Sequence, residues 1–245
     1  MAFVRQLPIL AALFSEFASG AETADGRPLM LNGQSGLLKL SGAGRTLQVD
    51  KLSLAGEGVS DPSQKCAVDI VGEKPIEATS VGSPDGLERF EVDVPACPFA
   101  FDLLEGAVFV PPQIAACVFK AADCQTSPGG LWGPDGSSLV GDAAKIAKDR
   151  AQAEKAMGRV LQAIDARART RPEAASLVRE QTAFAGQRDD ACKDYLKESV
   201  HGFCALRLTE ARTAFLRARL DEILAEGAKA KDDKGKKTKK GSEQP

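Results

Sequence analysis

The chain has little of what catalytic and metal-binding sites are usually built from. Its 245 residues include one His, one Tyr and one Trp. A zinc site with two His ligands is therefore impossible, and a nucleophile would have only that one His as its base. Neither a G-x-S-x-G motif nor a phosphate-binding P-loop occurs. We predict no catalytic residue, no metal site and no cofactor, and hence a protein that is not an enzyme.

The chain also lacks a strong excess of charge of one sign. Its 32 Lys and Arg against 34 Asp and Glu give a net charge of -2, which argues against nucleic acid as a partner. Residues 228–245 contain seven Lys and three acidic residues, so the remainder is acidic, with a net charge of -6. We expect the Lys-rich tail, residues 227–245, to be disordered.

No apolar run is long enough to span a bilayer, so we predict no transmembrane segment. The first residues, MAFVRQLPILAALFSEFASGAETA, combine one Arg, a short apolar segment at Leu7–Phe14 and small residues at Ala18–Gly20. This arrangement is typical of a secretory signal peptide, here residues 1–20, although Glu16 is unusual in one. The alternative is a short amphipathic helix at the start of a cytosolic protein.

The six cysteines are dispersed along the chain, at Cys66, Cys97, Cys117, Cys124, Cys192 and Cys204. Their number is even, and none has the C-x-x-C spacing of redox pairs or zinc ligands. An exported chain with such cysteines is expected to form disulfides, most naturally in a Gram-negative periplasm. The first four cysteines allow three sets of pairs. We prefer Cys66–Cys97 with Cys117–Cys124, although the sequence does not decide between them.

Residues 21–125 have the pattern of a β-rich domain. Short apolar runs alternate with turn sequences such as NGQSG and SPDG, and the runs TLQVDKLSL and ERFEVDV are apolar at alternate positions. That period is typical of a sheet with one face in water. Roughly seven such strands suggest an antiparallel sandwich or a small barrel. We predict a β-sandwich-like domain, followed by a Gly/Pro/Ser-rich linker at residues 126–138.

Residues 139–226 change to a helical pattern. After Gly141 the apolar residues recur at helical spacing, Asp142 is placed to cap a first helix, and Pro172 suits the first turn of a second. A third helix is expected from about Phe203 to Leu224. Three antiparallel helices of this kind would pack through amphipathic faces. The predicted fold class is therefore α+β.

Cys192 and Cys204 lie 12 positions apart in this helical segment. On one continuous helix they would be roughly 18 Å apart, whereas a disulfide needs Cα atoms within about 7 Å. Either they are not partners or the helix breaks between them, most obviously at His201–Gly202, because Gly takes the left-handed conformation readily. We predict a helical hairpin closed by Cys192–Cys204, stabilised by about 3 kcal/mol, with His201 in its turn.

Polar and aromatic side chains recur on one side of this hairpin. The residues that share a side of the second helix are Gln181, Phe184, Arg188 and Cys192. Those that repeat the spacing on the third helix are Thr209, Arg212 and Leu216. They form either a seam between helices, with Arg stems packed along it, or an exposed strip for a partner. Trp132, in GLWGPDG, is either a plug between the two domains or an exposed anchor for a partner or a glycan.

This pattern resembles the family of the lysozyme inhibitor LprI. That family shows a Q-x-x-W-x-x-x-R-D-x-x-C helix, then a second Cys ahead of a T-x-x-R-x-x-x-L helix. The matching positions are Gln181, Arg188, Asp189, Cys192, Cys204, Thr209, Arg212 and Leu216. Phe184 stands where the family usually has Trp, and an early Cys pair is absent unless Cys117 and Cys124 replace it. The resemblance covers residues 139–225, most strictly 180–216.

The resemblance implies a periplasmic binding or envelope-protection protein, with lysozyme or another envelope protein as its partner. An acidic body would attract a basic lysozyme. Two alternatives remain: a structural or assembly factor of the envelope, and a hydrolase using carboxylates such as Asp189–Asp190 or Asp221–Glu222. The candidate partner-binding residues are Gln181, Phe184, Arg188, Arg212 and Trp132.

Overall fold

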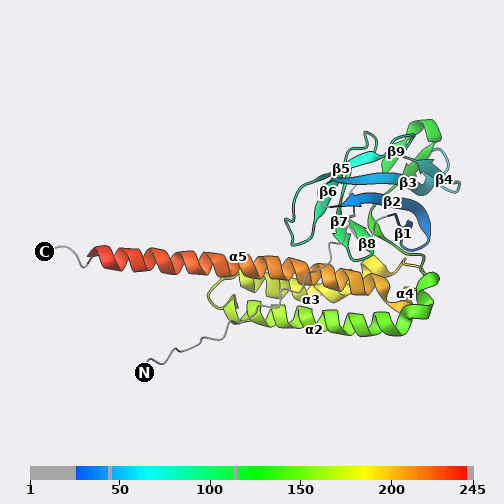
Figure 1. Cartoon of the computed structure of the whole chain (residues 1–245). Coiled ribbons are helices and arrows are strands. Elements are labelled where there is room, and N and C mark those ends of the chain that lie inside the picture. Colours follow the sequence, from blue (N-terminus) through cyan, green and yellow to red (C-terminus); the bar gives the residue numbers. More distant parts are fainter. Residues whose placement is uncertain (1–25, 44–45, 113–114, 242–245) are drawn as a thin grey trace, which may run out of the picture.

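The computed structural model describes residues 26–43, 46–112 and 115–241, which form a β-barrel packed on a group of helices (Figure 1). The strands are β1 (Leu29–Leu31), β2 (Ser35–Ala43), β3 (Thr46–Gly58), β4 (Lys65–Asp69), β5 (Ile76–Ser80), β6 (Arg89–Val92), β7 (Phe99–Leu104), β8 (Ala107–Val110), β9 (Cys117–Phe119), β10 (Cys124–Thr126) and β11 (Gly130–Gly133). The helices are η1 (Lys120–Ala122), η2 (Ser138–Asp142), α2 (Ala143–Ala168), α3 (Pro172–Cys192), α4 (Glu198–His201) and α5 (Phe203–Gly241). The predicted signal peptide lies outside the described residues.

Eight antiparallel strands close into a ring, in the order β1, β11, β8, β7, β6, β5, β3 and β2, with β2 pairing back to β1. The predicted sandwich is therefore wrong. The strand that links the two sides is β11, which lies inside the segment interpreted as a linker, residues 126–138. Trp132 pairs with Leu31 of β1 and with Val108 of β8, so this strand joins what would otherwise be two open edges. Alternating hydrophobicity describes a sandwich and a barrel equally well, and only these long-range pairings distinguish them.

The barrel interior is filled by apolar side chains. Phe90 and Phe101 stack with their ring centroids 5.6 Å apart, and both are almost completely buried. Trp132 is 1% exposed, and its Nε1 donates to the carbonyl of Pro128 at 2.8 Å. An indole N–H needs such an acceptor when it is buried. Trp132 is thus a core residue of the barrel, which corrects both interpretations made from the sequence.

Two disulfides tie the β-rich part together, Cys66–Cys124 and Cys97–Cys117, with Cα separations of 5.8 and 5.1 Å. The predicted pairs Cys66–Cys97 and Cys117–Cys124 are therefore wrong. Cys117 lies opposite Thr126 in the β9–β10 hairpin, so it is at the other end of that hairpin from Cys124. Strands β4 and β10 both pair with the far end of β3, which brings Cys66 beside Cys124.

Three long helices, α2, α3 and α5, run side by side below the barrel (Figure 1). Pro172 opens α3, as predicted, because a proline at the first helical position loses no hydrogen bond. Helix α5 extends past the ends of α2 and α3 and continues to Gly241. Residues 227–241 of the tail, which we expected to be disordered, are therefore helical. No helix in the described part of the chain is long and apolar enough to cross a bilayer.

The barrel and the helices share an apolar cluster. Leu104 and Leu131 of the barrel pack with Tyr195 and Phe203 of the helical half. The Tyr195 hydroxyl donates to the carbonyl of Pro134 at 2.7 Å, and burial raises the pKa of Tyr195. These contacts hold the turn between α3 and α5 against the barrel.

Candidate functional site

The disulfide between Cys192 and Cys204 joins the end of α3 to the start of α5, with their Cα atoms 5.6 Å apart. This pair confirms the prediction. Residues 193–202 lie between the two cysteines, and we call them the stapled turn. Gly202 ends α4 with a φ of 69°, the left-handed conformation expected at this position. The stapled turn therefore reverses the chain between the two cross-linked cysteines.

The side chain of Glu198 caps α5. Its two carboxylate oxygens accept hydrogen bonds from the backbone N–H groups of Cys204, at 3.0 Å, and Ala205, at 2.9 Å. These are donors that the start of a helix leaves without a backbone partner. Burial raises the pKa of Glu198, while the two N–H groups and the nearby His201 act in the opposite direction.

His201 completes the cap. Its Nδ1 accepts from the backbone N–H of Phe203 at 3.1 Å, and its Nε2 lies 2.9 Å from the carbonyl oxygen of Leu196. Nε2 therefore carries the proton and donates it to that carbonyl. His201 is 2% exposed, and both ring nitrogens are engaged within the stapled turn. This arrangement agrees with its interpretation as a turn residue.

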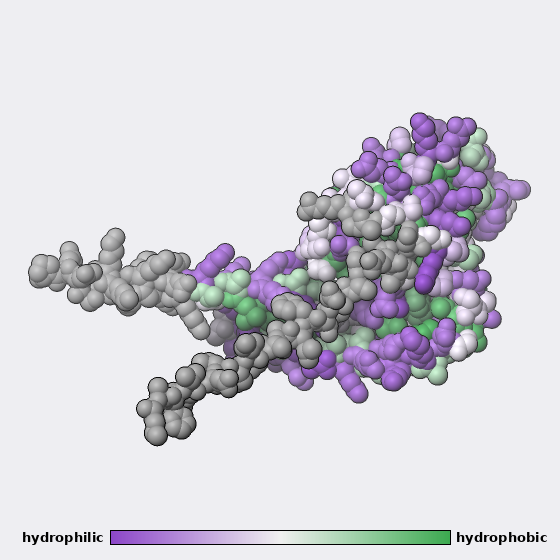
Figure 2. All heavy atoms as spheres, in the orientation of Figure 1, coloured by the Kyte–Doolittle hydropathy of each residue, from purple (hydrophilic) through white to green (hydrophobic). Residues whose placement is uncertain are grey.

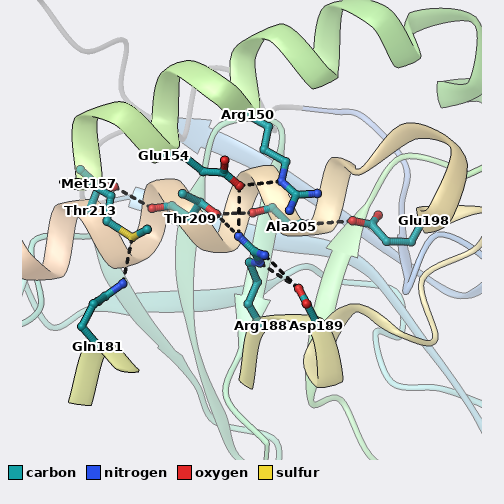
Figure 3. Close-up of polar contacts among 10 residues, drawn as sticks. All are labelled: Arg150, Glu154, Met157, Gln181, Arg188, Asp189, Glu198, Ala205, Thr209 and Thr213. Atoms are coloured by element: carbon teal, nitrogen blue, oxygen red, sulfur yellow. Dashed lines mark hydrogen bonds and ion pairs between the residues drawn. The ribbon is translucent and has the colours of Figure 1, made fainter. Parts of the chain in front are cut away.

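Arg188 of α3 is the centre of a polar network between the helices (Figure 3). Its side chain is 9% exposed. Its Nε donates to Asp189 at 3.0 Å, and its Nη1 donates to Glu154 at 3.4 Å and to Thr209 at 3.3 Å. Glu154 also accepts from Arg150 at 3.0 Å. A buried guanidinium must be paired with acceptor groups. This one bonds side chains on all three long helices, α2, α3 and α5.

Arg212 of α5 occupies a second place along the same seam. Its Nε donates to the side-chain oxygen of Gln181 at 3.1 Å, and its guanidinium carbon lies 5.8 Å from the ring centre of Phe184 and 4.8 Å from that of Phe215. Gln181 in turn donates to the sulfur of Met157 at 3.5 Å. Burial lowers the pKa of Arg212. The residues that the sequence singled out on α3 therefore contact α2 and α5.

The structure thus brings together four of the five candidate partner-binding residues, Gln181, Phe184, Arg188 and Arg212. They form the seam between helices, with Arg188 buried and the other three partly buried. They lie in the seam rather than on an exposed strip, because Arg188 and Arg212 each bond a side chain on a neighbouring helix. Trp132 lies apart from them in the barrel core.

An open groove of about 570 Å³ lies beside the stapled turn, between α2, α3 and α4. Small side chains from facing helices, Ala147, Ala151 and Ala205, leave this space open. The groove is also lined by the charged residues Arg150, Glu154, Asp189, Lys193 and Glu198. It therefore offers small apolar surfaces and charges of both signs.

One carboxylate of each pair considered for a hydrolase is bound by an arginine. Asp189 is bound to Arg188, and Glu222 is 3.0 Å from Arg219. Within the described residues, no group of three or more His, Cys, Asp or Glu is placed to hold a metal ion.

Sequence reasoning missed Glu198, Glu154 and Arg150 as members of this site. Arg150 and Glu154 are four residues apart on a predicted helix, a spacing typical of side-chain pairs, and this signal was available. The contact between Glu154 and Arg188 joins different helices and has no signal in the sequence.

Comparison with known proteins singles out the helical half. Residues 137–216 match the family model of the lysozyme inhibitor LprI. The match begins at the barrel-proximal end of the helices and ends within α5, so it includes the stapled turn, its disulfide and the Arg188 network. The chain matches no curated protein and no solved structure. The resemblance noted in the sequence is confirmed for this half of the chain.

Proposed function

We propose that this protein is an exported, non-enzymatic binding protein of the periplasm that protects the cell envelope by inhibiting a lysozyme. The observation that carries the proposal is the match of residues 137–216 to the LprI family. All six cysteines are paired in three disulfides. Disulfides persist in oxidising compartments and are rare in the cytosol, so their presence supports export.

The rigidity of the stapled turn favours it and the adjoining groove as the binding surface. The turn is held by the Cys192–Cys204 disulfide, by the Glu198 cap and by contact with the barrel through Tyr195. A surface that is ordered before binding loses less conformational entropy when a partner docks. The groove beside it lies within the matched residues.

The distribution of charge supports a basic partner. Residues 26–138 contain 8 Lys and Arg against 14 Asp and Glu, whereas residues 139–227 contain 16 against 14. The acidity of the body therefore belongs to the barrel, and hydrophilic residues cover most of the barrel face drawn in Figure 2. An acidic barrel would steer a basic lysozyme toward the molecule, which raises the association rate at low salt.

A turbidity assay tests this function. Purified mature protein is added in excess to a lysozyme, and the clearing of a suspension of lysozyme-sensitive cells is followed. We expect slower clearing, with the effect weakened by added salt because charge contributes to association. A rate unchanged by excess protein would contradict inhibition and favour a structural role in the envelope. Clearing by the protein alone would instead indicate a hydrolase.

A further inference from the structure

The stapled turn presents a small set of side chains outward. Tyr195 and Leu196 face the barrel, where Leu196 N–H donates to the carbonyl of Asn32 at 2.9 Å. Glu198 and His201 face α5, which they cap. The exposed side chains that remain after residue 196 are Lys197, Ser199 and Val200.

Val200 is the most exposed large apolar residue in the described part of the chain, at 55%. Val140, on the neighbouring η2, is 39% exposed. Exposed apolar side chains are common singly, and these two add apolar area to neighbouring elements at this end of the molecule. Val200 also lines the groove described above.

Lys197 holds a conformation that lysine rarely adopts. Its φ is 57° and its ψ is 25°, in the left-handed region, which costs a residue with a Cβ about 1 kcal/mol relative to glycine. In the described part of the chain, the other non-glycine residues with positive φ are Asn32 and Asp123, two types that tolerate it. Strain of this kind persists where the surrounding structure imposes it, and it clusters at functional sites.

Among the described residues, the Lys197 ammonium group forms no ion pair or hydrogen bond, whereas its backbone carbonyl accepts from the N–H groups of Val200, at 2.9 Å, and His201, at 3.4 Å. A glycine would satisfy the backbone there at lower cost. The backbone conformation therefore does not explain why a lysine rather than a glycine stands here. The lysine side chain is exposed on a turn that the disulfide and the helix caps keep rigid.

We propose that the stapled turn enters the substrate cleft of a lysozyme, with Lys197 and Val200 as its contact residues; this inference rests on the proposed function. Lysozymes cleave glycosidic bonds with two carboxyl groups that flank the bond. An ammonium group on a rigid turn complements such a cleft in charge, and a neighbouring valine supplies apolar contact at its wall. The acidic barrel brings the partner close, and the lysine is the group that meets the carboxylates.

The variant Lys197→Gly in the full-length mature protein tests this assignment. It removes the ammonium group and the strained conformation together, so we expect the melting temperature to stay equal or rise while the concentration for half-inhibition increases at least tenfold. Lys197→Arg keeps the charge and should retain most of the inhibition. Lys51→Ala removes another exposed lysine, on β3, and should inhibit like the wild type.

The variant Val200→Asp is a second test of the assignment. It places a like charge before the carboxylates, and we expect loss of inhibition without loss of stability, because Val200 packs little within the chain. If the wild type inhibits and both Lys197→Gly and Val200→Asp inhibit equally well, the contact assignment is overturned and the proposed function stands. If the wild type leaves lysis unchanged, the proposed function itself fails, and this assignment fails with it.

Discussion

The barrel and the helical half hold their shapes by different means. The barrel closes around an apolar core that contains Phe90, Phe101 and Trp132, and its strands need one another to bury that core. The helical half has a smaller core and adds the Arg188 network. Disulfides tie both parts, two in the β-rich part and one at the stapled turn. Apolar packing tolerates exchange of one hydrophobic residue for another, whereas a buried arginine requires particular partners.

The residues matched to the LprI family lie in the helical half, where Arg188, Thr209 and Cys192 are each tied to a specific partner. The β-rich part has contacts of this kind as well, including the disulfides Cys66–Cys124 and Cys97–Cys117. Arg89 also bonds Asp102 at 2.6 Å. The family match therefore covers the half that holds the Arg188 network, whereas the barrel holds the excess of negative charge.

The largest expected effect is a loss of stability caused by a change in the barrel core. Trp132→Ala removes a buried indole from the core, and we expect the free energy of unfolding to fall by about 3–5 kcal/mol. Urea unfolding followed by far-ultraviolet circular dichroism measures it. Val59→Ala, at a site 44% exposed, is the control and should stay within about 0.5 kcal/mol of the wild type. A Trp132→Ala loss below about 1 kcal/mol would show that β11 does not contribute to the core.

The next largest expected effect is a loss of stability in the helical half alone. Replacing Cys192 and Cys204 together by Ala should lower the free energy of unfolding by about 3 kcal/mol, since the loop between them is no longer closed in the unfolded chain. Hydrogen exchange should become faster at the start of α5, where Glu198 caps the helix, and remain slow in the barrel. Equal acceleration in both parts would contradict a separate role for this disulfide.

Arg188→Met tests the polar seam. The variant keeps the length of the stem but loses the bonds to Asp189, Glu154 and Thr209, and we expect destabilisation by about 2 kcal/mol. Arg179→Met, on an exposed site of the same helix, is the matched control. Equal unfolding free energies for the two variants would show that the network adds nothing to stability.

The smallest effect concerns the cap. Glu198→Gln should cost about 1 kcal/mol at neutral pH, because an amide N–H₂ would face one of the two backbone N–H donors. Burial raises the folded-state pKa of Glu198 above its unfolded value, so the folded state binds this proton more tightly. The contribution of Glu198 to stability therefore increases as pH falls through the folded-state pKa, and it becomes constant below the unfolded value.

The wild type should consequently gain stability over Glu198→Gln as the pH is lowered from 8 to 4, measured by urea unfolding at each pH. A difference that narrows on acidification would show that the two backbone hydrogen bonds, rather than burial, dominate the pKa of this carboxyl group.

The helical half was largely predictable. Pro172 and Gly202 act on the backbone beside them, and the spacing of Cys192 and Cys204 required a break that a local signal could locate. The candidate seam residues were found for the same reason, since helical spacing places Gln181 and Arg188 on one side. Their partners on α2 were not, because Glu154 is 34 positions away from Arg188.

Composition and local pattern were enough to establish the α+β character, the stapled helical hairpin and the likeness to the LprI family, because these depend on neighbours along the chain. Four features were decided only by the tertiary structure. They are the closure of the barrel, the pairs Cys66–Cys124 and Cys97–Cys117, the burial of Trp132 and the outward position of Lys197. Each of these depends on which distant strands or helices pack together. The free energy of that packing is distributed over many residues, so no single segment of the sequence determines it.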